Sequence, residues 1–149
     1  DACLGFGAKG AINYRQSDFV AETIRLTSDR GVDVVLDMVG GPYLDRNLDV
    51  LAHEGRISIV ATQGGRMGQL DIGKLMGKRA RVMGSTMRVR SKEEKGLVAQ
   101  RLLEAVWPSL PGKRWIKPVI DSTFPLREAR LAHERMEQGE HIGKIVLTF

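Results

Sequence analysis

The sequence is poor in the residues and runs that mark several classes of protein. It has one cysteine, Cys3, so no disulfide can form within the chain. No apolar run approaches the roughly 20 residues that a membrane-spanning helix needs, and no secretory signal is visible. Aromatic residues make up only 5% of the chain, too few for the base-stacking surfaces of single-strand binders. These absences favour a cytoplasmic protein that binds neither a membrane nor nucleic acid.

Positive charge is in excess, with a formal net charge of +5. The basic residues gather at 78–81 and 88–92. Solvated turns and helix ends explain such clusters, and attraction of an anion such as a cofactor phosphate is the alternative.

Apolar periodicity and turn residues predict alternating strands and helices. The strands are expected at 11–14, 32–39, 56–61 and 81–87. The helices are expected to begin at Ser17 or Asp18 and near Pro42, Asp71 and Ser91. The second strand has the uninterrupted apolar run of a strand that is buried on both faces. This order predicts an α/β fold with a parallel sheet, right-handed crossovers and flanking helices.

The helices also have predicted ends and buried faces. Gly31 is expected to follow the end of the first helix near Asp29, and Gly55 to end the second. The second helix is expected to bury a stripe made of Leu44, Leu48, Leu51 and Ala52. The third is expected to turn Ile72, Leu75 and Met76 inward.

The character of the sequence changes after Lys113. A strand is expected at 116–121, interrupted by Pro118. Pro125 is expected to open a helix that Gly139 closes, and a last strand follows at 145–149. The tail is too short to fold alone, so it is expected to complete a second domain.

Ligands of an open α/β sheet bind beyond the carboxyl ends of its strands. Those ends are expected at Tyr14, 39–41, 60–62 and 85–88. Gly40 and Gly41 would let the backbone approach a flat ligand, although a tight turn before Pro42 explains them equally well. Tyr14 could contact an adenine or a phosphate, or simply pack.

The residue types that bind metals show no suitable spacing. These are Cys3, His53, His133 and His141, which stand far apart in the sequence. No G-x-S-x-G nucleophile elbow is present, and the glycines of 64–68 form neither a P-loop nor the dinucleotide fingerprint. We expect no metal site.

Several strings resemble a known family. They are AINYR at 11–15, GVDVVLDMVGG at 31–41, FPL at 124–126 and GKIVL at 143–147. In this order and spacing, the chain resembles the zinc-independent quinone oxidoreductase branch of the medium-chain dehydrogenase/reductase superfamily. The resemblance implies a partial Rossmann-type dinucleotide-binding domain over 1–113 and a strand-helix-strand segment of the catalytic domain over 114–149.

The resemblance also implies a function and a site. The expected enzyme uses NADPH to reduce quinones or related enones by hydride transfer, as a homodimer formed through the edge strand 81–87. Tyr14 would approach the adenosine ribose phosphate, and Lys144 the pyrophosphate or the active-site cleft. The cofactor would be lined by Val39, Val60, Ala61 and Thr62. The nicotinamide end would be near Thr86, Met87 and Arg88. No residue here must act as a general acid, so none is expected to be catalytic.

The family's glycine-rich turn and its first two strands do not appear in this sequence, which begins at Asp1. We therefore expect a C-terminal piece that is inactive by itself. Strand 11–14 would lack its neighbour, and strand 32–39 would become an exposed apolar edge. The piece is expected to self-associate or to rearrange its first strand. The rival interpretations are an enoyl-thioester reductase of the same superfamily and a non-catalytic binding or dimerisation module.

Overall fold

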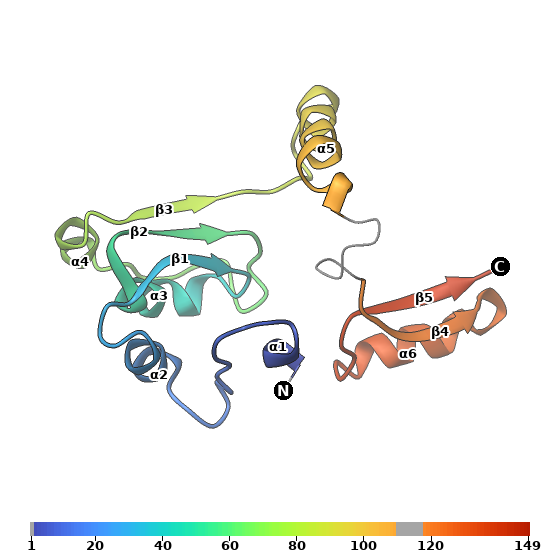
Figure 1. Cartoon of the computed structure of the whole chain (residues 1–149), viewed down its shortest axis with the longest axis horizontal. Coiled ribbons are helices and arrows are strands. Elements are labelled where there is room, and N and C mark those ends of the chain that lie inside the picture. Colours follow the sequence, from blue (N-terminus) through green and yellow to red (C-terminus); the bar gives the residue numbers. More distant parts are fainter. Residues whose placement is uncertain (1, 110–117) are drawn as a thin grey trace. The chain divides into compact units, whose positions relative to one another are not determined.

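The computed structural model describes residues 2–109 and 118–149 and divides the chain into two compact units, Asp1–Arg90 and Ser91–Phe149. Each unit holds its own parallel sheet, with strand order β1-β2-β3 in the first and β4-β5 in the second (Figure 1). The chain thus has the α/β class that the sequence predicts. The domain boundary expected at Lys113 lies outside the described residues.

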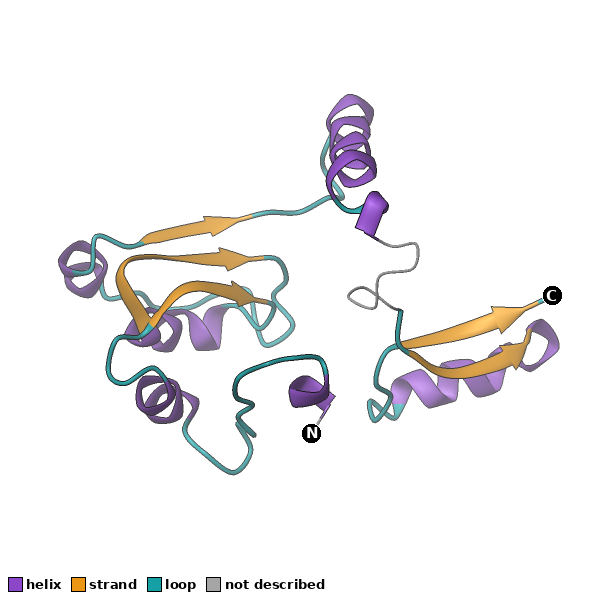
Figure 2. Ribbon diagram, in the orientation of Figure 1, coloured by secondary structure: helices purple, strands orange, loops and turns teal. Residues whose placement is uncertain are grey.

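The first unit alternates helices and strands along the chain (Figure 2). Its elements are α1 (Ala2–Gly5), α2 (Phe19–Leu26), β1 (Val32–Asp37), η1 (Gly41–Tyr43), α3 (Leu44–Val50), β2 (Leu51–Ile59), α4 (Ile72–Gly77) and β3 (Arg81–Gly84). The elements of the second unit are α5 (Lys92–Ala105), η2 (Trp107–Ser109), β4 (Ile120–Pro125), η3 (Leu126–Glu128), α6 (Ala129–Glu137) and β5 (Lys144–Thr148).

The core of the first unit lies between one face of the sheet and helix α3. Leu48 of α3 and Ile57 of β2 are fully buried, and Leu51 joins them. Val35 of β1 is paired with Ile57 and packs against this cluster. Apolar burial of this kind is the main favourable term in folding, so this face of the sheet anchors the unit.

The expectation that strand 32–39 is buried on both faces is wrong. β1 ends at Asp37, and Val34 and Leu36 are 46% and 66% exposed. The reason is that their side chains point away from the face that carries Val35 and Ile57, because strand side chains alternate. β1 is also an edge strand of its sheet, which confirms the expected exposed apolar edge.

The strand expected at 11–14 is also absent. This segment forms turns instead, and the backbone N–H of Gln16 donates to the carbonyl of Asn13 at 2.9 Å. A strand needs a neighbour to satisfy its backbone groups, and among the described residues no strand pairs with it. The prediction of a strand at 11–14 is therefore wrong, and the expected self-association or rearrangement stays a prediction.

Several element ends differ from the expected ones. α2 is capped by Asp18, as predicted, but it ends at Leu26, before Ser28 and Asp29 adopt positive φ angles. Gly31 therefore does not follow the helix end directly. β3 ends at Gly84, so residues 85–87 lie beyond the strand.

Helix α3 is shorter than predicted. It ends at Val50 rather than at Gly55, and strand β2 begins at the next residue. Leu51 and Ala52 are buried as expected, but they are buried from a strand. In α4, capped by Asp71 as predicted, Leu75 packs on the core. The expected inward positions of Ile72 and Met76 are wrong, because α4 is a short helix at the sheet margin and both side chains are exposed.

The second unit contains the predicted strand, helix and strand. β4 and β5 are parallel, and α6 packs against both of them. Asp121 of β4 binds Arg135 of α6 through two hydrogen bonds of 3.0 and 2.9 Å, which fastens the helix to the sheet. Residues 116 and 117 of the predicted strand lie outside the described residues, and β4 begins at Ile120.

Candidate functional site

The carboxyl ends of the three strands of the first unit meet at one edge of the sheet. Asp37, Ile59 and Gly84 are register partners at the ends of β1, β2 and β3. The backbone N–H of Val60 donates to the carbonyl of Asp37 at 2.8 Å, and that of Ser85 donates to the carbonyl of Ile59 at 3.0 Å. The strand-end wall is the name used below for residues 37–41, 59–65 and 84–88.

Two loops of the wall are joined by their backbones. These loops, 38–41 and 62–68, are called the glycine clasp below. The N–H of Gln63 donates to the carbonyl of Met38 at 3.1 Å and that of Gly64 to the carbonyl of Val39 at 2.8 Å. The N–H of Gly41 donates to the carbonyl of Gly65 at 2.9 Å. The loop after β1 is therefore fixed against the loop after β2.

Glycine is required where the two loops are closest. Gly40 has a φ of 88°, a conformation that residues with a side chain rarely adopt. A Cβ atom on Gly41 would lie only 1.9 Å from the carbonyl oxygen of Met67. Both glycines thus have a structural role in the clasp. This agrees in part with the alternative that the sequence left open, a tight turn before Pro42.

Asp37 is absent from the site residues that the sequence predicts, yet it organises the wall. Its side chain is buried, and its carboxylate accepts hydrogen bonds from the N–H of Val39 at 2.7 Å and from the N–H of Gly40 at 3.2 Å. The sequence pattern that could have identified Asp37 is an aspartate two residues before a turn. The side chain of such an aspartate commonly accepts a hydrogen bond from the backbone N–H two residues later.

Most of the predicted cofactor residues lie on the strand-end wall. Val39 follows β1, and Val60, Ala61 and Thr62 follow β2. Beyond β3 the wall continues with Thr86, Met87 and Arg88. Here the N–H of Arg88 donates to Oγ1 of Thr86 at 3.4 Å, and a guanidinium N–H of Arg90 donates to Oγ of Ser85 at 3.3 Å. The structure therefore brings the predicted ends of three strands together.

Two predicted residues lie elsewhere. Tyr14 is in a turn between α1 and α2 and is 63% exposed, so no strand end carries it. Lys144 is the first residue of β5, in the second unit, and its N–H donates to the carbonyl of Val119 at 2.8 Å. The roles expected for these two residues stay predictions.

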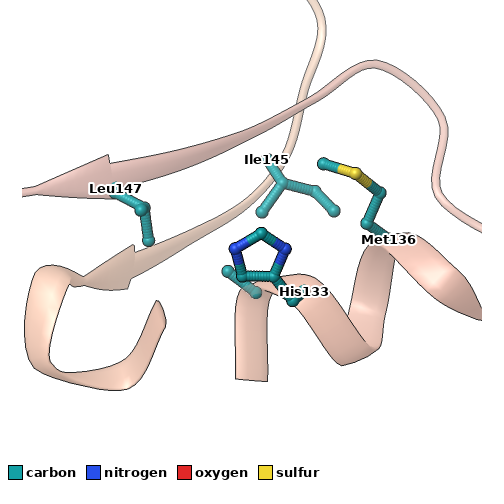
Figure 3. A pocket seen from close by; sticks show the side chains of 5 residues that line it. His133, Met136, Ile145 and Leu147 are labelled. Carbon is teal, nitrogen blue, oxygen red and sulfur yellow. The ribbon is translucent and has the colours of Figure 1, made fainter. Parts of the chain in front are cut away.

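Two hollows are lined by residues that do not belong to the wall. In the second unit, a cavity of about 80 Å³ is lined by Ala132, His133, Met136, Ile145 and Leu147. Figure 3 shows the imidazole of His133, from α6, pointing toward the strand that carries Ile145 and Leu147. This volume is well below the roughly 300 Å³ of small ligand pockets, so the cavity does not fit a dinucleotide.

The larger hollow, of about 450 Å³, lies in the first unit beside Asp45, Gln69, Leu70 and Asp71. Its carboxylates already have partners. Lys74 binds Asp45 at 3.0 Å and Asp49 at 2.7 Å, and the N–H of Asp71 donates to Asp45 at 3.0 Å. These bonds fasten α4 to α3, and the paired carboxylates attract no anionic cofactor.

Over residues 2–109 and 118–149, no three histidine, cysteine, aspartate or glutamate side chains gather in a way that could hold a metal ion. Over the same residues, no helix has the length and apolar character to span a membrane.

Comparison with known proteins places this geometry in a family. The family model described as zinc-binding dehydrogenase matches residues 6–147. The quinone oxidoreductase of Mus musculus is 30% identical over 145 residues, which are 95% of this chain and 41% of that protein. The Escherichia coli quinone oxidoreductase, solved in complex with NADPH, superposes with a TM-score of 0.73 at 26% identity over 99% of this chain and 45% of its own.

The JamJ enoyl reductase, solved in its apo form, shares the fold with a TM-score of 0.77 at 24% identity, over 99% of this chain and 43% of its own. The chain therefore spans less than half the length of these relatives. Because the family model covers nearly all of it, the chain belongs to the zinc-binding dehydrogenase family of the medium-chain dehydrogenase/reductase superfamily, with quinone oxidoreductases among its relatives.

Proposed function

We propose that the whole protein is an oxidoreductase that uses NADPH to reduce quinones or related enones, and that this chain supplies one wall of its cofactor site. The observation that carries the proposal is the strand-end wall, where three parallel strands end in register. Ligands of open α/β sheets bind at such edges. Similarity to quinone oxidoreductases, one of them solved with NADPH, supports the choice of cofactor and substrate.

The proposed roles follow the position of each segment. The cofactor is lined by Val39, Val60, Ala61 and Thr62, and its nicotinamide end by Thr86, Met87 and Arg88. Tyr14 is proposed for the adenosine ribose phosphate and Lys144 for the pyrophosphate or the cleft. A bound nicotinamide supplies the hydride, while the protein supplies binding, orientation and electrostatics. No residue of this chain is assigned a proton-transfer role.

The chain's residues fit a bound dinucleotide at the wall. Beside Gly40 and Gly41 the space is filled by the second loop of the clasp, so the surface open to a ligand comes from neighbouring residues of the wall. Val60 and Met87 are nearly half exposed at the same edge and offer apolar surface to a ring.

We also propose that the enzyme works without zinc, as the resemblance to the quinone oxidoreductase branch implies. Metal analysis of the purified whole protein should give far less than one zinc per chain. Stoichiometric zinc whose removal abolishes activity would contradict the proposal.

A homodimer through β3 is the proposed assembly. Among the described residues β3 pairs with β2 alone, and an edge strand of this kind can pair with a second chain. Sedimentation of the whole protein should give twice the mass of one chain. A monomer at micromolar concentration would contradict the proposed dimer but would not bear on the proposed cofactor site.

The function is tested with the whole protein, expressed from its complete coding sequence. We expect oxidation of NADPH when 1,4-benzoquinone is added, and much slower oxidation with crotonyl thioester. The reverse preference would favour the enoyl-thioester reductase, and no oxidation with either would favour the non-catalytic module.

A matched pair of variants locates the site. Ala61→Trp places a bulky ring on the strand-end wall and should raise the KM for NADPH by at least about tenfold, which corresponds to about 1.4 kcal/mol. Ala99→Trp makes the same change at an exposed position of α5 and should leave the KM unchanged. An equal effect of the two variants would contradict the placement of the site.

A further inference from the structure

We propose that Asp37 is a positioning residue of the cofactor site, whose carboxylate fixes the backbone of Val39 and Gly40 and thereby sets the shape of the strand-end wall. This inference rests on the proposed function. Asp37 is not proposed to touch the substrate or the cofactor. It acts through the turn that it holds.

The burial of Asp37 argues that its carboxylate has a specific use. Only 4% of the residue is exposed, and the partners of its carboxylate are backbone N–H groups rather than a cation. Burying a charge is costly unless it is hydrogen-bonded. The neighbouring strand ends on the same face carry Ile59 and Gly84, which avoid that cost. An aspartate is therefore retained here for the hydrogen bonds that it accepts.

Asp37 also links the first loop of the clasp to the end of β2. Its side chain accepts from Val39 and Gly40, and its main-chain carbonyl accepts from Val60 at 2.8 Å. The residues that it holds then bind the second loop, since the carbonyl of Val39 accepts from Gly64 at 2.8 Å. Loss of the carboxylate would leave the N–H groups of Val39 and Gly40 without their acceptor and loosen the turn, while the backbone bonds between the two loops remain.

These hydrogen bonds also determine which part of a cofactor the clasp can bind. The N–H groups of Val39 and Gly40 are taken by Asp37, and those of Gly41, Gln63 and Gly64 by carbonyls of the opposite loop. An anion needs free N–H donors, and the buried carboxylate adds negative charge. This part of the wall therefore suits an uncharged portion of the cofactor, and its phosphates must be held by other groups.

The test compares three variants of the whole protein. Asp37→Ala removes the acceptor, whereas Asp37→Asn keeps one acceptor oxygen in nearly the same place. Asp33→Ala is the control, because Asp33 lies on the same strand but is exposed and pairs with the Arg30 side chain, through bonds of 2.8 Å, rather than with the turn.

The dissociation constant for NADPH is measured by fluorescence titration at a temperature where each variant is folded. We expect Asp37→Ala to weaken binding by at least about tenfold, Asp37→Asn by less than about threefold and Asp33→Ala not at all. The KM for NADPH should rise more than kcat falls. An Asp37→Ala variant that is less stable but binds NADPH normally would overturn the inference, and so would an Asp37→Asn variant that fails equally.

Amide hydrogen exchange of the wild type gives a second measurement, should Asp37→Ala not fold. The amides of Val39 and Gly40 should exchange slowly and be protected further by NADPH. Unprotected amides at these two residues would overturn the inference. A wild-type protein that gives no saturable NADPH signal would instead overturn the proposed function itself.

Discussion

Leu48 is the residue on which the packing of the first unit most depends. It is fully buried between α3 and the sheet, beside Ile57 and Leu51. Leu48→Ala should lower the free energy of unfolding by about 2–5 kcal/mol, the range for a leucine truncated in a core. Urea denaturation measures this loss. Leu97→Ala is the control, because Leu97 is 59% exposed and its truncation should change stability by less than about 0.5 kcal/mol. Equal losses would contradict the assigned core.

Asp121 makes the second unit sensitive to acid. The hydrogen bonds from Arg135 hold the pKa of its carboxyl well below the ordinary value of 3.8, against a smaller opposing effect of burial. Because the folded pKa is the lower one, the stabilisation is complete above the unfolded value and is lost as the pH falls below about 3.8. Asp121→Asn should therefore remove part of the acid-induced loss of stability.

The measurement for Asp121 is urea denaturation of wild type and variant at neutral pH and at pH values below that of the free carboxyl. The difference in unfolding free energy between them should shrink as the pH falls. Glu137→Gln, an exposed position of α6, serves as the control. A difference that is the same at every pH would contradict the role of the Arg135 contact.

The helix-capping residues could be predicted from the sequence, whereas the role of Asp37 could not. Asp18, Asp71 and Ser91 each accept from the backbone within the first turn of their own helices, so the signal is contained in a few neighbouring letters. Asp37 sits at the end of an apolar strand, and its use depends on how the chain turns after it. The turn is fixed by a second loop more than twenty residues away, which a local pattern does not reveal.

The predicted element boundaries are wrong where contacts with adjacent strands, rather than the propensity of the local residues, decide where an element ends. The apolar stripe of α3 continues into Leu51, but the backbone there joins β2, since the sheet offers ladder hydrogen bonds that a longer helix would forgo. The segment 11–14 has strand-like residues but forms turns, because no strand of the described chain lies beside it. Helix and strand order was predictable, while these ends were set by the tertiary structure.

The exposed edge of β1 predicts self-association of the 149-residue chain. Val34 and Leu36 are exposed on β1, which within residues 2–109 and 118–149 pairs with β2 alone, and such edges pair with other chains. Leu36→Lys should lower the average mass measured by light scattering, because charged side chains oppose edge pairing. Met76→Lys, at an exposed position of α4 rather than on β1, should not. A wild-type chain that is already a monodisperse monomer would contradict this prediction.

At the scale of the whole molecule, the main feature is that β1, β2 and β3 end together at one edge of their sheet. The relatives are more than twice as long as this chain, so the opposite wall of a cofactor groove would come from residues that the chain does not contain. The second unit carries Lys144 and has its own sheet and its own packed helix. The proposed role of that unit therefore rests on the family resemblance, and the proposed role of the strand-end wall on the convergence of the strand ends.

Hydrogen exchange of the whole protein, with and without saturating NADPH, tests the strand-end wall most directly. We predict that the cofactor slows exchange in 37–41, 59–65 and 84–88, while the β4–β5 sheet of the second unit changes less. Saturable binding that leaves all three segments unchanged, and protects residues elsewhere, would contradict the account.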